Sequence, residues 1–231
     1  MKQLLQRLTE TFSPSGYEDS IRELIRKEIK PYADNIRVDA LGNLIARKGR
    51  AAARGKRIMI AAHMDEIGLI ASHIDARGFV RFSTVGGVHA RNLAGGRVRF
   101  VNGATGVIGV HDGVDHPSVN ELFIDVGASS KKDCPVKVGD IAAFERPFME
   151  MGSRWVAKSL DDRVGVLVVI ETMRALKSTP HEIHFVFTTQ EEIGVRGATT
   201  ASYGVDPELG LAVDVTLAAD TPHAAKMEVQ L

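Results

Sequence analysis

Four short clusters of histidine and carboxylate residues stand out along the sequence. Each follows an apolar run with the composition of a buried strand, or opens the helix that comes next. The clusters are AHMDE (His63, Asp65, Glu66), SLDDR (Asp161, Asp162), TTQEE (Glu191, Glu192) and AVDVT (Asp214). Because ligands bind at the carboxyl ends of strands in open α/β sheets, we expect the clusters to meet at one place.

The residue types in these clusters suit a metal site. Imidazole nitrogen and carboxylate oxygen together form a ligand set that fits zinc, cobalt or manganese. Asp65 is placed to orient His63, because a metal-bound imidazole usually donates its other ring N–H to a carboxylate. The doubled glutamate at 191–192 fits a two-metal hydrolase, in which one carboxylate binds metal and a second carries a proton from water to the leaving group.

Each cluster also has an ordinary structural explanation when it is taken alone. A histidine at a strand end is more often hydrogen-bonded within the fold than bound to metal. Ser159 and Asp162 have the spacing of a helix capping box. The glutamate pair could be a solvated loop, and Asp214 could form a turn. It is the occurrence of all four clusters together, three at strand ends and one at the start of a helix, that favours a metal site.

The hydrophobic pattern predicts the elements that would hold these clusters. Apolar residues at helical spacing, and short runs rich in β-branched residues, divide both ends of the chain into helices and strands. We expect helices at 4–12, 17–29, 162–177 and 195–202, and strands at 35–39, 43–48, 56–63, 181–189 and 207–215. A helix that joins two apolar strands indicates a βαβ unit, so we predict a three-layer α/β domain with a mostly parallel central sheet.

The middle of the chain has a different texture. Residues 67–148 contain many short strand-like runs separated by glycine, asparagine and aspartate, without a convincing helix. This pattern is typical of a small antiparallel barrel or sandwich. We therefore predict a β-barrel domain at 67–148, inserted into a peptidase-type domain formed by residues 1–66 and 149–231.

The composition excludes several classes of protein. The 231 residues include 29 Lys and Arg and 29 Asp and Glu, so no excess of basic charge indicates a nucleic-acid partner. Cys134 is the single cysteine, the N-terminus lacks the apolar core of a signal peptide, and no stretch is long enough to span a membrane. We expect a cytoplasmic protein that acts on small molecules or peptides.

Taken in order, the motifs AHMDEIGLI, AKSLDDRVG, TTQEEIGVRGA and AVDVT resemble those of the M42 metallo-aminopeptidases, of the glutamyl or deblocking aminopeptidase type. The likeness runs from the first helix to the last residue. It implies an aminopeptidase with an inserted β-barrel and two divalent metal ions (Zn, Co or Mn) per chain. A peptide substrate and a homo-oligomer, a dimer or a dodecamer-type assembly, are also implied.

The resemblance assigns roles to individual residues. It implies that His63, Asp161 and Asp214 hold one metal, and that Asp161 bridges to a second metal also held by Glu192. Glu191 is then the general base and acid. Asp65, which its spacing places beside His63, is the second residue that we expect to be catalytic. The choice of Asp161 over Asp162 comes from the family pattern, because spacing alone leaves it open.

The sequence also departs from the family pattern. Family members continue beyond this length, and their remaining metal ligand is a histidine in that C-terminal part, so the chain is expected to be C-terminally truncated. His223 is the only histidine after Asp214, but it lies in TPHAAK, at the wrong place in the pattern.

Three alternatives to an active aminopeptidase follow from these observations. A shortened, catalytically weak or silent homologue would bind one metal or none. A glycoside hydrolase, such as a glucanase, would need only two suitably separated acids, which leaves the histidine and the remaining carboxylates without a role. A structural or interaction protein would bind no metal at all.

Overall fold

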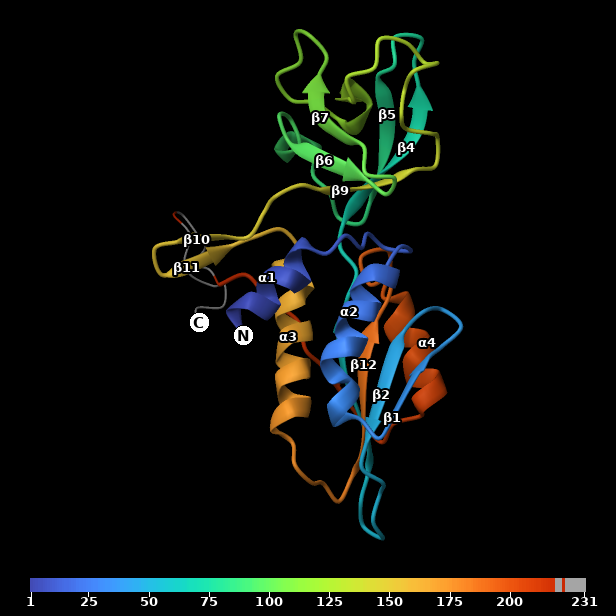
Figure 1. Cartoon of the computed structure of the whole chain (residues 1–231), viewed down its shortest axis with the longest axis vertical. Helices are drawn as coiled ribbons and strands as arrows, with labels where there is room; N and C mark the ends of the chain where they lie inside the picture. Colours follow the sequence, from blue (N-terminus) through green and yellow to red (C-terminus); the bar gives the residue numbers. More distant parts are fainter. Residues whose placement is uncertain (219–221, 223–231) are drawn as a thin grey trace.

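In this computed structural model, which describes residues 1–218 and 222, a helix-covered sheet carries a separate barrel (Figure 1). The sheet has the order β1 (Asn35–Val38), β2 (Leu44–Lys48), β12 (Glu182–Thr188), β3 (Arg57–His63), β13 (Leu209–Ala212). Strands β12, β3 and β13 are mutually parallel, whereas β2 pairs antiparallel with both β1 and β12.

The expected mostly parallel sheet is thus confirmed, because β2 alone runs opposite to the other four strands of this sheet. The reason is the length of the connections. A tight turn, in which Asp39 accepts the backbone N–H groups of Leu41, Gly42 and Asn43, joins β1 to β2 and allows only a hairpin. The parallel strands β12 and β13 are instead separated by a helix, as a crossover requires.

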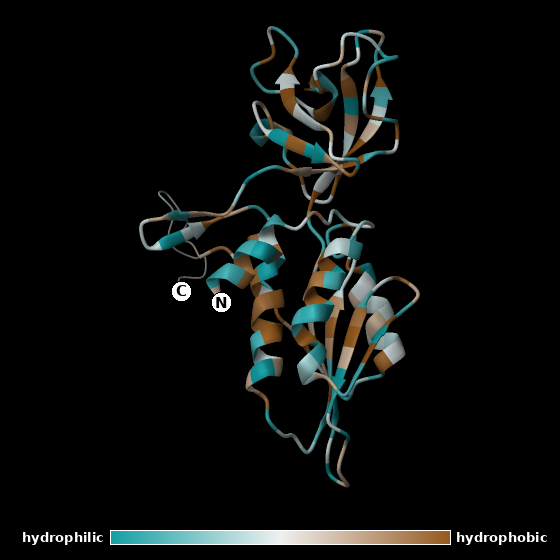
Figure 2. Ribbon diagram, in the orientation of Figure 1, coloured by the Kyte–Doolittle hydropathy of each residue, from teal (hydrophilic) through white to brown (hydrophobic). Residues whose placement is uncertain are grey.

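Helices cover both faces of the sheet, so the predicted three layers are present. Helices α1 (Lys2–Glu10), α2 (Asp19–Ile29) and α3 (Leu160–Ala175) lie on one face, and α4 (Arg196–Val205) lies on the other. Alternate residues of β2 divide between the two cores: Leu44 and Ala46 pack with α1 to α3, whereas Ile45 packs with α4. Figure 2 shows the apolar residues gathered between these layers.

The barrel is formed by six antiparallel strands closed in the order β4-β5-β8-β7-β6-β9. They are β4 (Gly68–Ile74), β5 (Val80–Val85), β6 (Arg97–Phe100), β7 (Thr105–Val110), β8 (Leu122–Asp125) and β9 (Ile141–Phe144). Its buried residues form a core of their own, separate from the cores of the sheet. The β-rich middle of the chain is therefore a closed barrel rather than a sandwich.

Smaller elements complete the described part of the chain. A hairpin of β10 (Met149–Met151) and β11 (Arg154–Val156) follows the barrel, and 3-10 turns lie at Lys30–Tyr32, Ala90–Asn92 and Val119–Glu121. Within residues 1–218, the helices are too short or too polar to qualify as membrane-spanning segments.

Glu66 ties together the two chain crossings between sheet and barrel. It lies just after β3, where the chain leaves the sheet, and its side chain is 2% exposed. Its carboxylate accepts hydrogen bonds from Lys158 Nζ and Ser159 Oγ on the returning chain, and from the backbone N–H of Ser13 at 2.9 Å. These contacts fix the start of α3 against the end of β3.

Candidate metal centre

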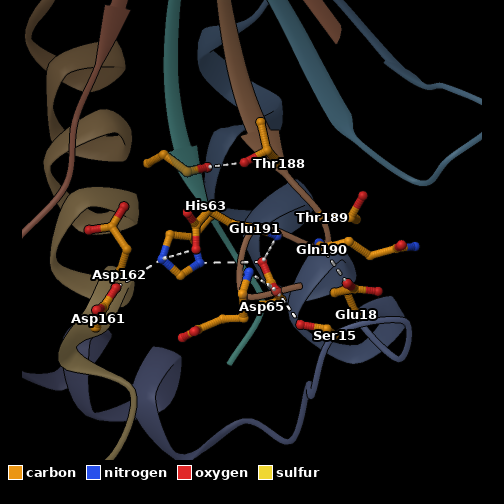
Figure 3. Close-up of polar contacts among 12 residues, drawn as sticks. Ser15, Glu18, His63, Asp65, Asp161, Asp162, Thr188, Thr189, Gln190 and Glu191 are labelled. Carbon is orange, nitrogen blue, oxygen red and sulfur yellow. Dashed lines mark hydrogen bonds and ion pairs between the residues drawn. The ribbon is translucent and has the colours of Figure 1, made fainter. Parts of the chain in front are cut away.

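His63 lies at the centre of the candidate site. It is the last residue of β3, and its side chain is 3% exposed. Its Nε2 atom lies 2.9 Å from Asp161 Oδ1 and 3.9 Å from Glu191 Oε2 (Figure 3). The carboxyl ends of β3 and β12 and the start of α3 therefore converge on one imidazole, as the strand-end rule predicts.

Asp161 and Asp162 are neighbours whose side chains have different surroundings. Both have non-helical backbone angles inside α3, with φ/ψ of −80°/111° and −115°/41°. The side chain of Asp161 is 62% exposed, whereas Asp162 is fully buried and accepts the backbone N–H of Gly165 at 3.0 Å. Asp162 thus satisfies the first helical turn, and the expected capping box with Ser159 does not form, because the Ser159 hydroxyl bonds to Glu66 instead.

Two groups of side chains in the described part of the chain have the dimensions of a metal site. In each group, one ligand atom per residue lies within 4.8 Å of the others; the groups are His63, Asp161 and Glu192, and His63, Asp162 and Asp214. The sequence expectation placed Asp161, rather than Asp162, with His63 and Asp214. The structure brings all the expected ligands around His63 but groups Asp162 with Asp214, because the two aspartates diverge.

Asp65 connects the histidine to the doubled glutamate. Its Oδ1 atom lies 3.3 Å from His63 Nδ1, an ion-pair distance without the alignment of a good hydrogen bond. The same carboxylate accepts the backbone N–H groups of Glu191 at 3.0 Å and Glu192 at 3.2 Å, and the hydroxyl of Ser15 (Figure 3). The contact of Asp65 with His63 is the one that their spacing in the sequence predicts. Nothing in the sequence predicts the contact with Ser15, which comes from a distant loop.

The histidine is held in its charged form when no metal is bound. Burial disfavours the imidazolium, but the hydrogen bond to Asp161 and the close contact and charge of Asp65 outweigh burial and raise the pKa of His63 to about 10. Conversely, the close contact and charge of the His63 imidazolium, with the hydrogen bond from the Ser15 hydroxyl, outweigh burial and lower the pKa of Asp65. Asp65 and His63 therefore form an ion pair at neutral pH.

The surrounding carboxylates are crowded. Burial raises the pKa of Asp162 to about 7; His63 opposes the shift, and Asp214 adds to it. Burial likewise raises the pKa of Glu192 to about 7, with repulsion from Asp161, Asp65 and Glu191. Burial and neighbouring acids also raise the pKa of Glu191. These acids lack enough cationic partners, which is the condition that a bound divalent cation relieves.

An unsatisfied oxygen points to the same conclusion. Asp162 Oδ2 is buried and has no hydrogen-bond partner among the described residues, although buried carboxylate oxygens are normally paired. An imidazole nitrogen and carboxylate oxygens at metal-binding separations form a donor set that suits zinc, cobalt or manganese. The residues present therefore fit a divalent metal centre. His223, the weak candidate for a further ligand, lies outside the described residues.

A model of the M42 glutamyl aminopeptidase family matches residues 42–231. A relative from Acetivibrio thermocellus is 44% identical over 236 residues, which span 100% of this chain and 70% of that protein. An aminopeptidase structure from the archaeon Desulfurococcus kamchatkensis is 41% identical, with a TM-score of 0.93 over 98% of this chain and 66% of its own.

Two further solved structures bear on assembly and on activity. The TET1 peptidase of Pyrococcus horikoshii, described as assembling into a tetrahedron or a large octahedral shell, is 34% identical, with a TM-score of 0.83 over 96% of this chain and 72% of its own. A protein from Thermotoga maritima, described as an endoglucanase, is 35% identical, with a TM-score of 0.83 over 97% of this chain and 69% of its own. The chain thus spans about two thirds of the length of the proteins that it matches.

Proposed function

The chain belongs to the M42 glutamyl aminopeptidase family, and from this premise we propose that it is a metal-dependent aminopeptidase that removes N-terminal residues from peptides. The observation that carries the proposal is the cluster around His63. Asp161 lies 2.9 Å from the imidazole, and Glu191 and Glu192 come from the adjoining strand end. A general acid–base and metal ligands are then adjacent, as hydrolysis of a peptide bond requires.

Four residues would hold the metal ions: His63, Asp161, Glu192 and Asp214. Two divalent ions, of zinc, cobalt or manganese, are proposed for the complete site, with Asp161 shared between them. When bound, such ions polarise a carbonyl group and lower the pKa of water. Asp162 is close enough to His63 and Asp214 to be an alternative ligand, so the assignment between the two aspartates is part of the proposal.

Glu191 is the proposed general base and acid. It belongs to neither of the two metal-sized groups, and it lies near His63 with its side chain 32% exposed. Its carboxylate can therefore accept a proton from water and pass it to the leaving amine. Burial raises its pKa, which makes its carboxylate a stronger proton acceptor. Asp65 supports the reaction by holding the His63 imidazole and the backbone of Glu191 in place.

The space beside His63 limits what the described residues can bind. A cavity of about 100 Å³ is lined by His63, Glu191 and Asp214, together with Val195, Ala198 and other residues of β3, β12, α4 and β13. It is smaller than a typical ligand pocket. The described residues therefore supply the reactive groups and only a small part of a substrate pocket.

A homo-oligomer and a cytoplasmic location complete the proposal. The TET1 peptidase of similar fold forms large assemblies. The hairpin of β10 and β11 exposes Met149, Met151 and Trp155, which is an unusual density of apolar side chains for a free surface. Cys134 is a free thiol, in keeping with a reducing compartment.

Metal analysis combined with a peptidase assay tests the proposal. The purified chain is assayed on a panel of aminoacyl p-nitroanilides, and metal content is measured before and after a chelator. Activity that disappears with the chelator and returns with zinc, cobalt or manganese is expected. Bound metal without activity would support the silent homologue, and absence of both would support a structural protein.

The likeness to a structure described as an endoglucanase calls for a second assay. A glycosidase needs two carboxylates and no metal, so sugar hydrolysis that persists after chelation would favour that function. The crowding of carboxylates around a buried histidine has no role in such a mechanism. We therefore expect no hydrolysis of β-glucans.

A further inference from the structure

The loop that carries the doubled glutamate is held in place by hydrogen bonds from its backbone N–H groups. Residues 189–192 follow β12, and each of their four consecutive N–H groups donates to a buried side chain from another part of the fold. Thr189 donates to Asn43 at 3.0 Å, and Gln190 donates to Glu18 at 3.1 Å. The next two N–H groups donate to Asp65, as described above. Within the described residues no strand pairs with this loop, so these side chains fix its conformation together with the backbone N–H groups of residues 194–197, which donate to its carbonyl oxygens.

Glu18 has an unusual position for a glutamate. It directly precedes α2 and is only 4% exposed. Its Oε1 atom accepts the N–H of Gln190 and also that of Gly16, at 2.8 Å, in the loop that supplies Ser15 (Figure 3). A buried carboxylate is costly unless it accepts hydrogen bonds, and here both acceptor contacts are to backbone groups. The side chain thus links the N-terminal loop to the site.

Gln190 is the residue whose conformation most needs support. Its φ of 55° is in the left-handed region, which a residue with a β-carbon adopts at a cost. This angle turns the chain at the end of β12, and the next two N–H groups then point at Asp65. A hydrogen bond to the Gln190 N–H holds the turn at its strained residue.

We propose that Glu18 is a positioning residue, which through Gln190 sets the directions in which Glu191 and Glu192 present their carboxylates. The inference rests on the proposed function for the roles of those two glutamates. Glu18 touches neither substrate nor metal; it acts through the backbone. Asn43 holds the loop in the same way one residue earlier, because its Oδ1 accepts hydrogen bonds from both the N–H and the hydroxyl of Thr189.

Site-resolved amide hydrogen exchange tests the proposal on the metal-free chain. In Glu18→Ala, the amides of residues 190–192 are expected to exchange about tenfold faster, because one buried hydrogen bond is lost. The amides of Phe185 and Phe187 within β12 should stay unchanged. Glu18→Gln keeps an acceptor oxygen at the same reach and should restore most of the protection. Glu182→Gln, at the opposite end of β12, is the matched control and should leave the loop unaffected.

Zinc affinity provides the second readout. In Glu18→Ala it should fall by roughly 10-fold to 100-fold, as removal of a residue that supports a metal ligand usually does, and Glu18→Gln should recover it. Exchange within twofold of the unmutated chain at residues 190–192, or an equal increase throughout β12, would overturn the positioning role. If Glu18→Ala does not fold, Glu18→Asp replaces it in the exchange experiment. Because the aspartate side chain is shorter, the Gln190 amide should exchange faster in Glu18→Asp than in Glu18→Gln. Faster exchange in Glu18→Gln than in Glu18→Asp would refute the proposal.

The two hypotheses fail in different ways. If the unmutated chain binds no metal and cleaves no peptide, the proposed function is wrong, whereas the exchange rates still decide what Glu18 does. If metal binds but the loop is indifferent to Glu18, only the positioning role is wrong.

Discussion

Asp161 Oδ1 lies 2.9 Å from His63 Nε2, although 98 residues separate them in the sequence and the whole barrel lies between. The contact joins the end of β3 to the start of α3, so the chain leaves the sheet and returns to it at the same place. Glu66, on the outgoing chain, holds this junction together by accepting hydrogen bonds from Lys158 and Ser159 on the returning chain. A barrel can therefore be inserted here without separating the two halves of the site.

The first prediction distinguishes the two adjacent aspartates. Asp161→Asn should weaken zinc binding roughly 10-fold to 100-fold with little loss of stability, because the side chain is exposed and its carboxylate faces His63. Asp162→Ala should mainly lower the free energy of unfolding, by about 1–3 kcal/mol, because alanine cannot accept the backbone N–H of Gly165. Competition titration with a zinc indicator and urea unfolding measure the two effects. Loss of zinc in Asp162→Ala alone would make Asp162 the ligand.

The second prediction concerns pH. In the metal-free chain the pKa values of His63, Asp162 and Glu192 are all raised, to about 10, 7 and 7. The folded state therefore binds more protons than the unfolded state, and its stability falls as pH rises from about 4 towards 10. Metal binding displaces these protons, so the gain in Tm on adding zinc should grow between pH 6 and pH 9.

Calorimetry in buffers of different ionisation enthalpy gives an independent measurement of the same effect. Zinc binding at pH 8 should release about one proton, that of His63. His184, which pairs with Glu182 at the far end of β12, offers the control: His184→Gln should not change the number of protons released. A zinc-induced shift in Tm that is constant between pH 6 and pH 9 would contradict the assignment of His63 as a metal ligand that is protonated in the metal-free chain.

The third prediction tests the packing behind the glutamate loop. A β-carbon added at Gly197 would lie 2.3 Å from the carbonyl oxygen of Thr189 and 2.4 Å from Asn43 Oδ1. Gly197→Ala should therefore lower the free energy of unfolding by about 1–3 kcal/mol. Gly204, in the same helix, has no atom within 4 Å of an added β-carbon, and Gly204→Ala should be stabilising by about 0.5–1 kcal/mol. If Gly197→Ala and Gly204→Ala change the free energy of unfolding in urea equally, the packing of Gly197 against Thr189 and Asn43 is not rigid.

Much of this arrangement could be predicted from the sequence, and the limits have a physical origin. The helix and strand periods locate His63, Asp161, Glu192 and Asp214 at the ends of elements, and the strand-end rule then brings them together. The antiparallel pairing of β2 with β12 was missed, because the pattern of a single strand does not reveal which neighbour it will have.

Side-chain direction was the other limit. Asp161 and Asp162 differ in burial because of two non-helical backbone angles, which no spacing of residues encodes. Ser15, Glu18 and Asn43 reach the site from turns and loops far away in the sequence, and their contacts depend on tertiary structure alone. The side-chain types of the candidate site, and the position of Asp65 beside His63, could thus be predicted, whereas the residues from distant loops that hold the glutamate loop could not.

The final prediction concerns proton transfer by Glu191. Glu191→Gln should lower peptidase turnover by about 10²-fold to 10⁴-fold, the usual contribution of general acid–base catalysis, while metal content stays unchanged. Metal should remain because Glu191 lies outside both metal-sized groups, and because its backbone N–H, unaffected by the substitution, still donates to Asp65. Glu192→Gln is the matched variant and should instead lower metal affinity. Retained activity in Glu191→Gln would refute its role, and loss of metal in that variant would make Glu191 a ligand rather than the base.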